Sequence, residues 1–185
     1  IETYNLANGT NTFSFSTVAS QSANGSGGVD TFVMRGNATA AGYSGNDIYQ
    51  VLSGTNNVIT TLGFGPSSPV VQVSAGATAT GTTSGDWTAG VGSSNAGSIT
   101  INLDGAAGGA YTLDLHNATG TQGWILNGLG KVGIIIGSSQ GDAITAGDTV
   151  YGRTVTITGG AGIDSIYGPT GTSGDNAVFN VASGA

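Results

Sequence analysis

The stretch Gly159-Gly160-Ala161-Gly162-Ile163-Asp164-Ser165-Ile166-Tyr167 is the part of this sequence that decides the expected fold. It is an unbroken copy of the nonapeptide G-G-x-G-x-D-x-U-x, in which U is a large apolar residue. Its glycines accept positive φ and form a turn whose backbone carbonyls point inward, and Asp164 adds a carboxylate. Its second half predicts a short strand that sends Ile166 into a core. The nonapeptide therefore predicts turns and short strands that stack on one another.

Four further stretches keep part of this pattern. Residues 25–32 and 42–49 keep the first and fourth glycine, the aspartate and the apolar residue. Residues 171–178 have an asparagine for the aspartate, and residues 137–144 lack the fourth-position glycine. We therefore expect turns of this kind within 25–52 and 137–181, with the candidate polar residues Asp30, Asp47, Asp142, Asp175 and Asn176.

Such turns are candidate calcium sites. Calcium takes about six to eight oxygen ligands, and one turn supplies about half of them, so a site needs two stacked or facing turns. The candidate metal ligands are Gly160, Gly162, Asp164, Asp30, Asp47, Asp142, Asp175 and Asn176. The alternative for each aspartate is an Asx-type hydrogen bond within the turn and no ion. Calcium sites would make the chain loose at low calcium and ordered at high calcium.

The rest of the chain predicts strands. About eleven short segments rich in β-branched and aromatic residues recur between Gly, Asn and Ser, and no helical periodicity of useful length is present. These segments are 11–15, 30–34, 47–52, 57–62, 70–73, 98–103, 111–115, 123–126, 131–136, 154–158 and 177–181. The expected fold is all-β, either an irregular β-solenoid or β-roll or a β-sandwich, with glycine-rich calcium-binding turns.

The expected organisation is a single β-rich domain or protein segment over residues 1–185. A loose internal boundary is expected within 63–95, where bulky residues are few. The first residue, Ile1, is not a methionine and no leader pattern follows it, which favours a processed or excised piece.

Composition excludes several functions. The 185 residues include 35 glycines, only three Lys or Arg and a net charge of −7, which argues against binding to a nucleic-acid backbone. No apolar run is long enough to span a bilayer. With no cysteine and one histidine, thiolate chemistry and common zinc sites are excluded. His116 follows Asp114 closely, but no serine motif accompanies them, so a cross-strand hydrogen bond is favoured over a catalytic triad.

The nonapeptide and its partial copies resemble the repeats of the RTX family, secreted bacterial proteins whose repeats wind into a calcium-filled parallel β-roll. The resemblance covers about a third of the chain and implies bound calcium, type I export with an uncleaved carboxy-terminal signal, and an extracellular or cell-surface location. The spacings depart from the family pattern, since Asp30 and Asp47 are 17 residues apart and Asp142 and Asp164 are 22 apart. The low charge and the Thr, Gly, Ala and Asn excess resemble bacterial S-layer proteins and adhesins.

The leading functional hypothesis is a non-enzymatic, extracellular structural protein. It would be a calcium-stabilised subunit or segment of a bacterial surface layer, filament or matrix that self-assembles, because low charge leaves few ions to desolvate and strand edges can pair. The expected partner is another copy of the chain, with a cell-surface glycan as a further partner. One alternative is a calcium-binding adhesin or other binding module that contacts glycans or ice. Another is the carboxy-terminal RTX roll of a secreted enzyme.

Overall fold

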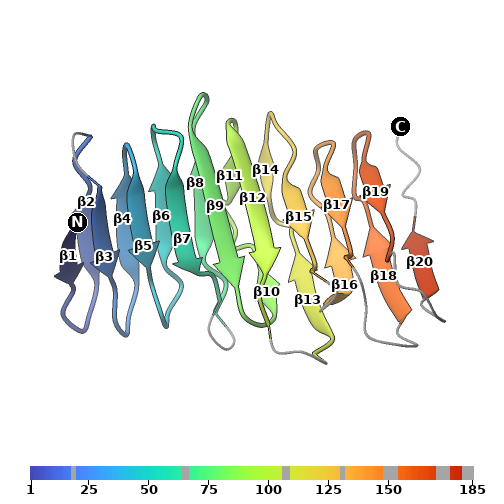
Figure 1. The fold of residues 1–185 in the computed structure, drawn as a ribbon, viewed down its shortest axis with the longest axis horizontal. Coiled ribbons are helices and arrows are strands. Elements are labelled where there is room, and N and C mark those ends of the chain that lie inside the picture. The colour runs from blue at the N-terminus through green and yellow to red at the C-terminus, as the bar shows by residue number, and fades with distance from the viewer. Residues whose placement is uncertain are drawn as a thin grey trace.

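The protein is an all-β solenoid in which every described pair of neighbouring strands is parallel (Figure 1). The structure is a computed structural model and describes residues 1–17, 20–63, 67–105, 109–129, 132–147, 154–169 and 176–180. Over these residues it contains strands and turns, and no helix that could cross a membrane. The expected all-β class is confirmed, and the solenoid is the form that the chain adopts.

The strands belong to three sheets. The first sheet has nine strands: β1 (Glu2–Asn5), β3 (Gln21–Asn24), β5 (Ala38–Ala41), β7 (Asn57–Thr61), β9 (Thr78–Thr83), β12 (Ser98–Leu103), β15 (Ile125–Asn127), β17 (Ala143–Thr145) and β19 (Ser165–Tyr167). The second sheet contains β2 (Asn11–Ser14), β4 (Asp30–Met34), β6 (Ile48–Val51), β8 (Val70–Val73), β11 (Ser94–Asn95) and β14 (Thr119–Gly120). The third contains β10 (Trp87–Thr88), β13 (Tyr111–Asp114), β16 (Val132–Ile136), β18 (Thr154–Thr158) and β20 (Asn176–Asn180).

The partner of the first sheet changes along the solenoid axis. From β1 to β8 the chain alternates between the first and second sheets, and from β15 to β20 it alternates between the first and third. In between, a coil visits the first, third and second sheets in turn, as in β9, β10 and β11. The first sheet therefore runs the length of the molecule, and Figure 1 shows its strands side by side from the N-terminal to the C-terminal end.

Coil length varies while the strand register is kept. Gln21 pairs with Ala38, 17 residues later, whereas Trp87 pairs with Leu113, 26 residues later. Extra residues enter the turns, because parallel pairing requires only that each strand finds its place beside the preceding one. This variation accounts for the irregular spacing of the aspartates in the sequence.

The core lies between the sheets and is formed by alternate residues of each strand. In β12 the inward residues Ile99, Ile101 and Leu103 are buried, while Thr100 between them is half-buried on the outer face. Trp87 and Trp124 are also buried, with ring centroids 6.4 Å apart, close to where coils visit three sheets. The period of two thus places one face of each strand in the core.

The segment 63–95, where the sequence predicts a loose boundary, contributes strands to all three sheets. Within it, β9 pairs in register with both β7 and β12, so the first sheet continues through the segment. Gly81 faces the core there, and a Cβ at this position would approach Leu62 and Ile101 to within 3 Å. Close packing between coils therefore requires glycine at position 81.

Candidate calcium-binding turns

Four aspartates stand at the ends of glycine-rich turns, each at the start of a strand. Asp30 is the first residue of β4 and Asp47 precedes β6, so both lie where the chain enters the second sheet. Asp142 precedes β17 and Asp164 precedes β19, so both lie where the chain enters the first sheet. We call these four residues the corner aspartates. They form two separate columns, each of which follows the solenoid axis.

In the column at the second sheet, each carboxylate accepts a hydrogen bond from the preceding coil. The backbone N–H of Asn11 donates to Oδ1 of Asp30 over 3.2 Å, and the Asn11 side chain donates to the same oxygen over 2.7 Å. The N–H of Asp30 in turn donates to Oδ1 of Asp47 over 2.9 Å. Asn11 and Asp30 pair in the sheet register, so donor and acceptor occupy equivalent positions in successive coils.

The column at the first sheet repeats this arrangement. The N–H of Trp124 donates to Oδ1 of Asp142 over 2.7 Å, and the N–H of Asp142 donates to Oδ1 of Asp164 over 2.9 Å. The residues that follow these three, at the starts of β15, β17 and β19, pair directly with one another. The same bond between coils therefore forms at two different corners of the solenoid.

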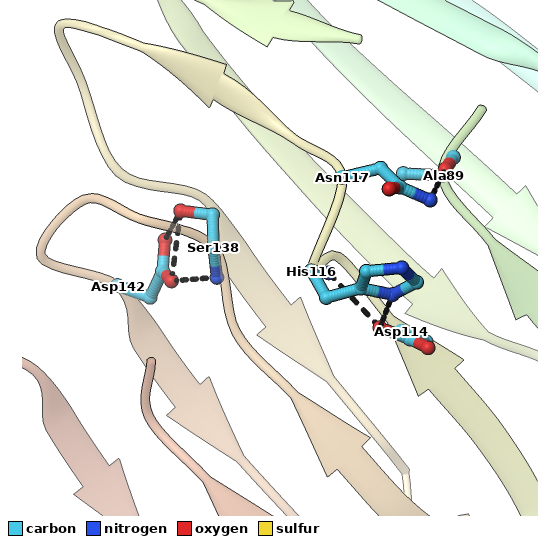
Figure 2. A network of polar contacts seen from close by, with 6 residues as sticks. All are labelled: Ala89, Asp114, His116, Asn117, Ser138 and Asp142. Atoms are coloured by element: carbon cyan, nitrogen blue, oxygen red, sulfur yellow. Dashed lines mark hydrogen bonds and ion pairs between the residues drawn. The ribbon is translucent and has the colours of Figure 1, made fainter. Parts of the chain in front are cut away.

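The second carboxylate oxygen closes the turn that contains it. Oδ2 of Asp30 accepts the N–H of Ser26 over 3.1 Å, and Oδ2 of Asp142 accepts the N–H of Ser138 over 2.6 Å. The Ser138 hydroxyl lies 3.0 Å from both oxygens of Asp142, as Figure 2 shows. In both turns the donor is four residues before the aspartate, which is a local side-chain to backbone bond that favours a turn.

A glycine five residues before each corner aspartate leaves space for the carboxylate. A Cβ added to Gly25 would lie 2.5 Å from Oδ2 of Asp30, and one added to Gly137 would lie 2.7 Å from Oδ2 of Asp142. The equivalent Cβ atoms at Gly42 and Gly159 would contact Oδ2 of Asp47 and of Asp164 still more closely. The sequence signal for such a turn is therefore a glycine, four intervening residues and then an aspartate.

Gly160 and Gly162 serve the backbone of their turn. Their φ angles are +98° and +101°, a region that favours glycine. A Cβ on Gly160 would contact the carbonyl oxygen of Ser138 in the preceding coil, and one on Gly162 would approach Gln140 and Gly141. These glycines let successive turns stack closely.

Burial changes the acidity of these carboxyl groups. Asp30, Asp47 and Asp142 are only 0%, 3% and 2% exposed. Burial raises the pKa of Asp47 from 3.8 to about 6, although the N–H bond from Asp30 opposes the shift, and the Asp30 charge adds to it. Burial likewise raises the pKa of Asp142, against the hydrogen bonds from Trp124 and Ser138. In the described part of the chain, no Lys, Arg or His pairs with a corner aspartate.

Hydrogen bonds, with no ion, satisfy the carboxylates of Asp30 and Asp142 in this structure. Both oxygens of each carboxylate accept hydrogen bonds, so a calcium ion would have to compete with these donors. No group of three His, Asp or Glu side chains converges anywhere in the described ranges. Asp47 and Asp164 each accept the N–H of the preceding coil through Oδ1. Calcium at those two residues stays a prediction.

Two other predicted ligands lie elsewhere. Asp175 is outside the described residues. Asn176 is the first residue of β20, is exposed, and pairs with Thr154 in the third sheet rather than standing in a turn. It is therefore not brought together with the corner aspartates.

His116 and Asp114 pair with each other. Nδ1 of His116 lies 2.8 Å from Oδ1 of Asp114, which also accepts the His116 backbone N–H over 2.9 Å (Figure 2). This contact lies within one turn, so the expected bond between strands is replaced by a local one. The nearby Ser138 hydroxyl is bonded to Asp142, and the described residues around His116 form no Ser-His-Asp arrangement.

Buried asparagines complete other turns, and sequence reasoning missed them. The side-chain amide of Asn57 donates to the carbonyl oxygens of Ser53 over 2.9 Å and of Thr78 over 3.1 Å, the latter in the next coil. Asn95 donates to the carbonyl of Gly123 over 2.6 Å. The available signal was an asparagine at the end of a short strand, since Asn57 is the first residue of β7 and Asn95 the last of β11.

The comparisons with known proteins find no match to the chain. No family model matches it, and neither the curated proteins nor the solved structures include a significant match.

Proposed function

We propose that the chain is a non-enzymatic, extracellular structural protein, a subunit or segment of a bacterial surface layer, filament or matrix whose solenoids stack end to end. The observation that supports this most directly is the pair of edges of the first sheet. Among the described residues, β1 and β19 each have one neighbouring strand in that sheet. An edge of this kind offers its N–H and C=O groups to another chain.

The strand direction allows such stacking. All described pairs are parallel, so β19 of one copy can pair with β1 of the next copy as β17 pairs with β19 within the chain. Only the first sheet would continue across the junction, because the strand after β1 is β2 of the second sheet, whereas β20, which follows β19, belongs to the third. Tyr4 near one end and Phe179 near the other are 37% and 47% exposed. Their burial would contribute to association.

The outer face of the first sheet supports close packing of copies. Its outward positions, taken from the strand register, are neutral from β3 to β19, because they carry hydroxyl, amide and apolar side chains, with Ile125 and Tyr167 as the large exposed ones. They include Ser22, Asn24, Thr39, Val58, Thr80, Thr82, Thr100, Asn102, Asn127, Thr145 and Ser165. A neutral face buries no unpaired charge when another molecule covers it.

Electron microscopy and light scattering on the purified chain test the proposal, in chelator and in about 1–10 mM calcium. We expect ordered polymers that lengthen along the solenoid axis. Monomers at every concentration in both solutions would contradict the proposal.

An edge variant tests the mode of stacking. The backbone N–H of Leu6 points into the sheet and donates to the Asn24 carbonyl. Backbone N–H groups along a strand point alternately to its two sides, so the N–H of Thr3, three residues earlier, faces the open edge. Thr3→Pro removes this donor, and we expect folded monomers by circular dichroism and light scattering. Thr3→Val keeps the N–H and is the matched control, which should polymerise like the unmodified chain.

The same neutral face favours a second candidate function, a binding module for neutral glycans. Thr80 pairs with Thr100, and Thr82 with Asn102, so hydroxyl and amide groups repeat from strand to strand about 4.8 Å apart. Cosedimentation of folded monomer with an insoluble neutral polysaccharide tests it. Binding that Thr100→Lys abolishes would favour this candidate, and no binding would exclude it.

A further inference from the structure

We infer that the corner aspartates join successive coils as hydrogen-bond acceptors and that this stacking needs no calcium. The inference departs from the calcium role that the glycine-rich nonapeptide predicts. It does not depend on the proposed self-assembly, because it concerns bonds within one chain.

The direction of the donors is the first argument. Oδ1 of Asp30 accepts two N–H groups of Asn11, one from the backbone and one from the side chain, while Oδ2 accepts Ser26 N–H. Oδ1 of Asp142 accepts Trp124 N–H, and both of its oxygens lie 3.0 Å from the Ser138 hydroxyl. Hydrogen bonds to a charged acceptor contribute more than neutral ones, so each carboxylate is held in place without a cation.

The spacing of the aspartates is the second argument. The bond between coils forms over 17 residues from Asp30 to Asp47, 18 from Trp124 to Asp142 and 22 from Asp142 to Asp164. A calcium ion held between two turns needs about six to eight oxygen ligands gathered from both turns. The hydrogen bond needs only one N–H at the equivalent position of the preceding coil, which the sheet register supplies at any coil length.

The space beneath each turn is the third argument. The glycine five residues before each corner aspartate has no side chain, and the carboxylate Oδ2 fills that space at Gly25, Gly42, Gly137 and Gly159. The glycine therefore allows the carboxylate to reach the backbone of its own turn, where its hydrogen-bond donors lie.

Thermal unfolding of the chain of residues 1–185 in EGTA and in 10 mM calcium tests the inference, with magnesium as the control ion. We expect the Tm of the unmodified chain to differ by less than about 2 °C between the solutions, a shift smaller than that from 1 kcal/mol in a chain of this size. Calorimetric titration with calcium alone should show no saturable binding. A calcium-specific rise in Tm of 5 °C or more, or saturable binding in that titration, would overturn the inference.

A substitution separates the hydrogen bonds from ion binding. Asp142→Asn keeps an acceptor for Trp124 N–H but places an amide N–H₂ against Ser138 N–H, so we expect Tm to fall by about 4–10 °C, equally in EGTA and in calcium. Asp114→Asn is the control, because in the described part of the chain the Asp114 carboxylate accepts hydrogen bonds only from His116, and it should leave Tm nearly unchanged. A fall in Tm that appears only in calcium would show an ion ligand instead.

Hydrogen exchange reports on the bond between Trp124 and Asp142 itself, whereas Tm reports only on overall stability. In the unmodified chain, the amide hydrogen of Trp124 should be protected in EGTA, since it donates to a buried carboxylate. Asp142→Ala should speed the exchange of the Trp124 amide more than that of the Ile144 amide, which lies in the same coil as Asp142. Rapid exchange at Trp124 in EGTA that becomes slow on adding calcium would overturn the inference.

Discussion

The backbone N–H of Asp142 donates a 2.9 Å hydrogen bond to Oδ1 of Asp164, its counterpart one coil further along the solenoid. Asp142 is at the same time an acceptor, through its own carboxylate, for the N–H of Trp124. Asp142 therefore accepts a hydrogen bond from the preceding coil and donates one to the following coil. The corner aspartates link successive coils at the places where strands of the first and second sheets begin.

Replacing the glycine that lies five residues before a corner aspartate should destabilise the protein. Gly42→Ala places a Cβ against Oδ2 of Asp47 and the hydroxyl of Tyr49, so we expect a loss of about 1–3 kcal/mol in the free energy of unfolding. Gly85→Ala is the matched control, since a Cβ there meets nothing within 4 Å and should change stability by less than about 0.5 kcal/mol. Urea unfolding followed by circular dichroism measures both. Equal effects of the two substitutions would contradict this role of Gly42.

Stability should increase on mild acidification. Burial raises the pKa of Asp47 from 3.8 in the unfolded chain to about 6 in the folded one, so between these values the folded state binds more protons. The contribution of Asp47 to the free energy of unfolding is therefore greatest below about pH 4, and it falls by about 1–3 kcal/mol as the pH rises through 6. Urea unfolding at intervals from pH 4 to pH 8 measures this slope. Asp47→Asn should flatten it, and a slope unchanged in that variant would assign it to other groups.

The side-chain amide of Asn57 should contribute strongly to stability. It is itself buried and donates to the part-buried carbonyls of Ser53 and Thr78, so Asn57→Ala removes both bonds, at a cost of about 1–3 kcal/mol. Asn57→Asp should cost more, because a carboxylate would face the same carbonyl oxygens. Asn127→Ala, on the outer face of β15, is the control and should have a small effect. Chemical unfolding that ranks the Asp variant as the mildest of the three would disprove the assignment.

Trp87 and Trp124 should act as a coupled pair in the widest part of the core. Both are buried, and they are the two tryptophans of the sequence, so emission should shift to longer wavelength on unfolding. Either substitution by alanine should cost about 3–5 kcal/mol. Because their rings lie 6.4 Å apart, the double substitution should cost less than the two single losses together. Strict additivity in a double-mutant cycle would show that they do not interact.

Sequence patterning identified strands where bulky residues alternate. The ranges predicted for 30–34, 70–73, 98–103 and 154–158 are the ranges of β4, β8, β12 and β18. It missed the strands Ala38–Ala41 and Thr78–Thr83, because alanine and glycine are depleted in strands and their mixture with threonine lacks the bulky alternating residues that mark a strand. These strands form because neighbouring coils supply their hydrogen-bond partners.

The turn before Asp164 likewise combines features that the local sequence predicts with one that depends on a neighbouring coil. The positive-φ glycines and the turn are readable from the nonapeptide, and both Gly160 and Gly162 adopt the expected conformation. Whether the Asp164 carboxylate faces an ion or an N–H depends on the residue in the neighbouring coil, which is Asp142, 22 residues away. No local pattern records that distance, since coil length varies.

The sequence by itself determined the all-β class, the glycine turns and the alternation that separates inner from outer residues, because these follow from local backbone freedom and from the period of two along a strand. Only the tertiary structure decided the solenoid with its change from the second to the third sheet, the pairing of coils of unequal length and the partners of the corner aspartates. The physical reason is that parallel strands bond to segments one coil away, so each of these features depends on contacts between residues far apart in the chain.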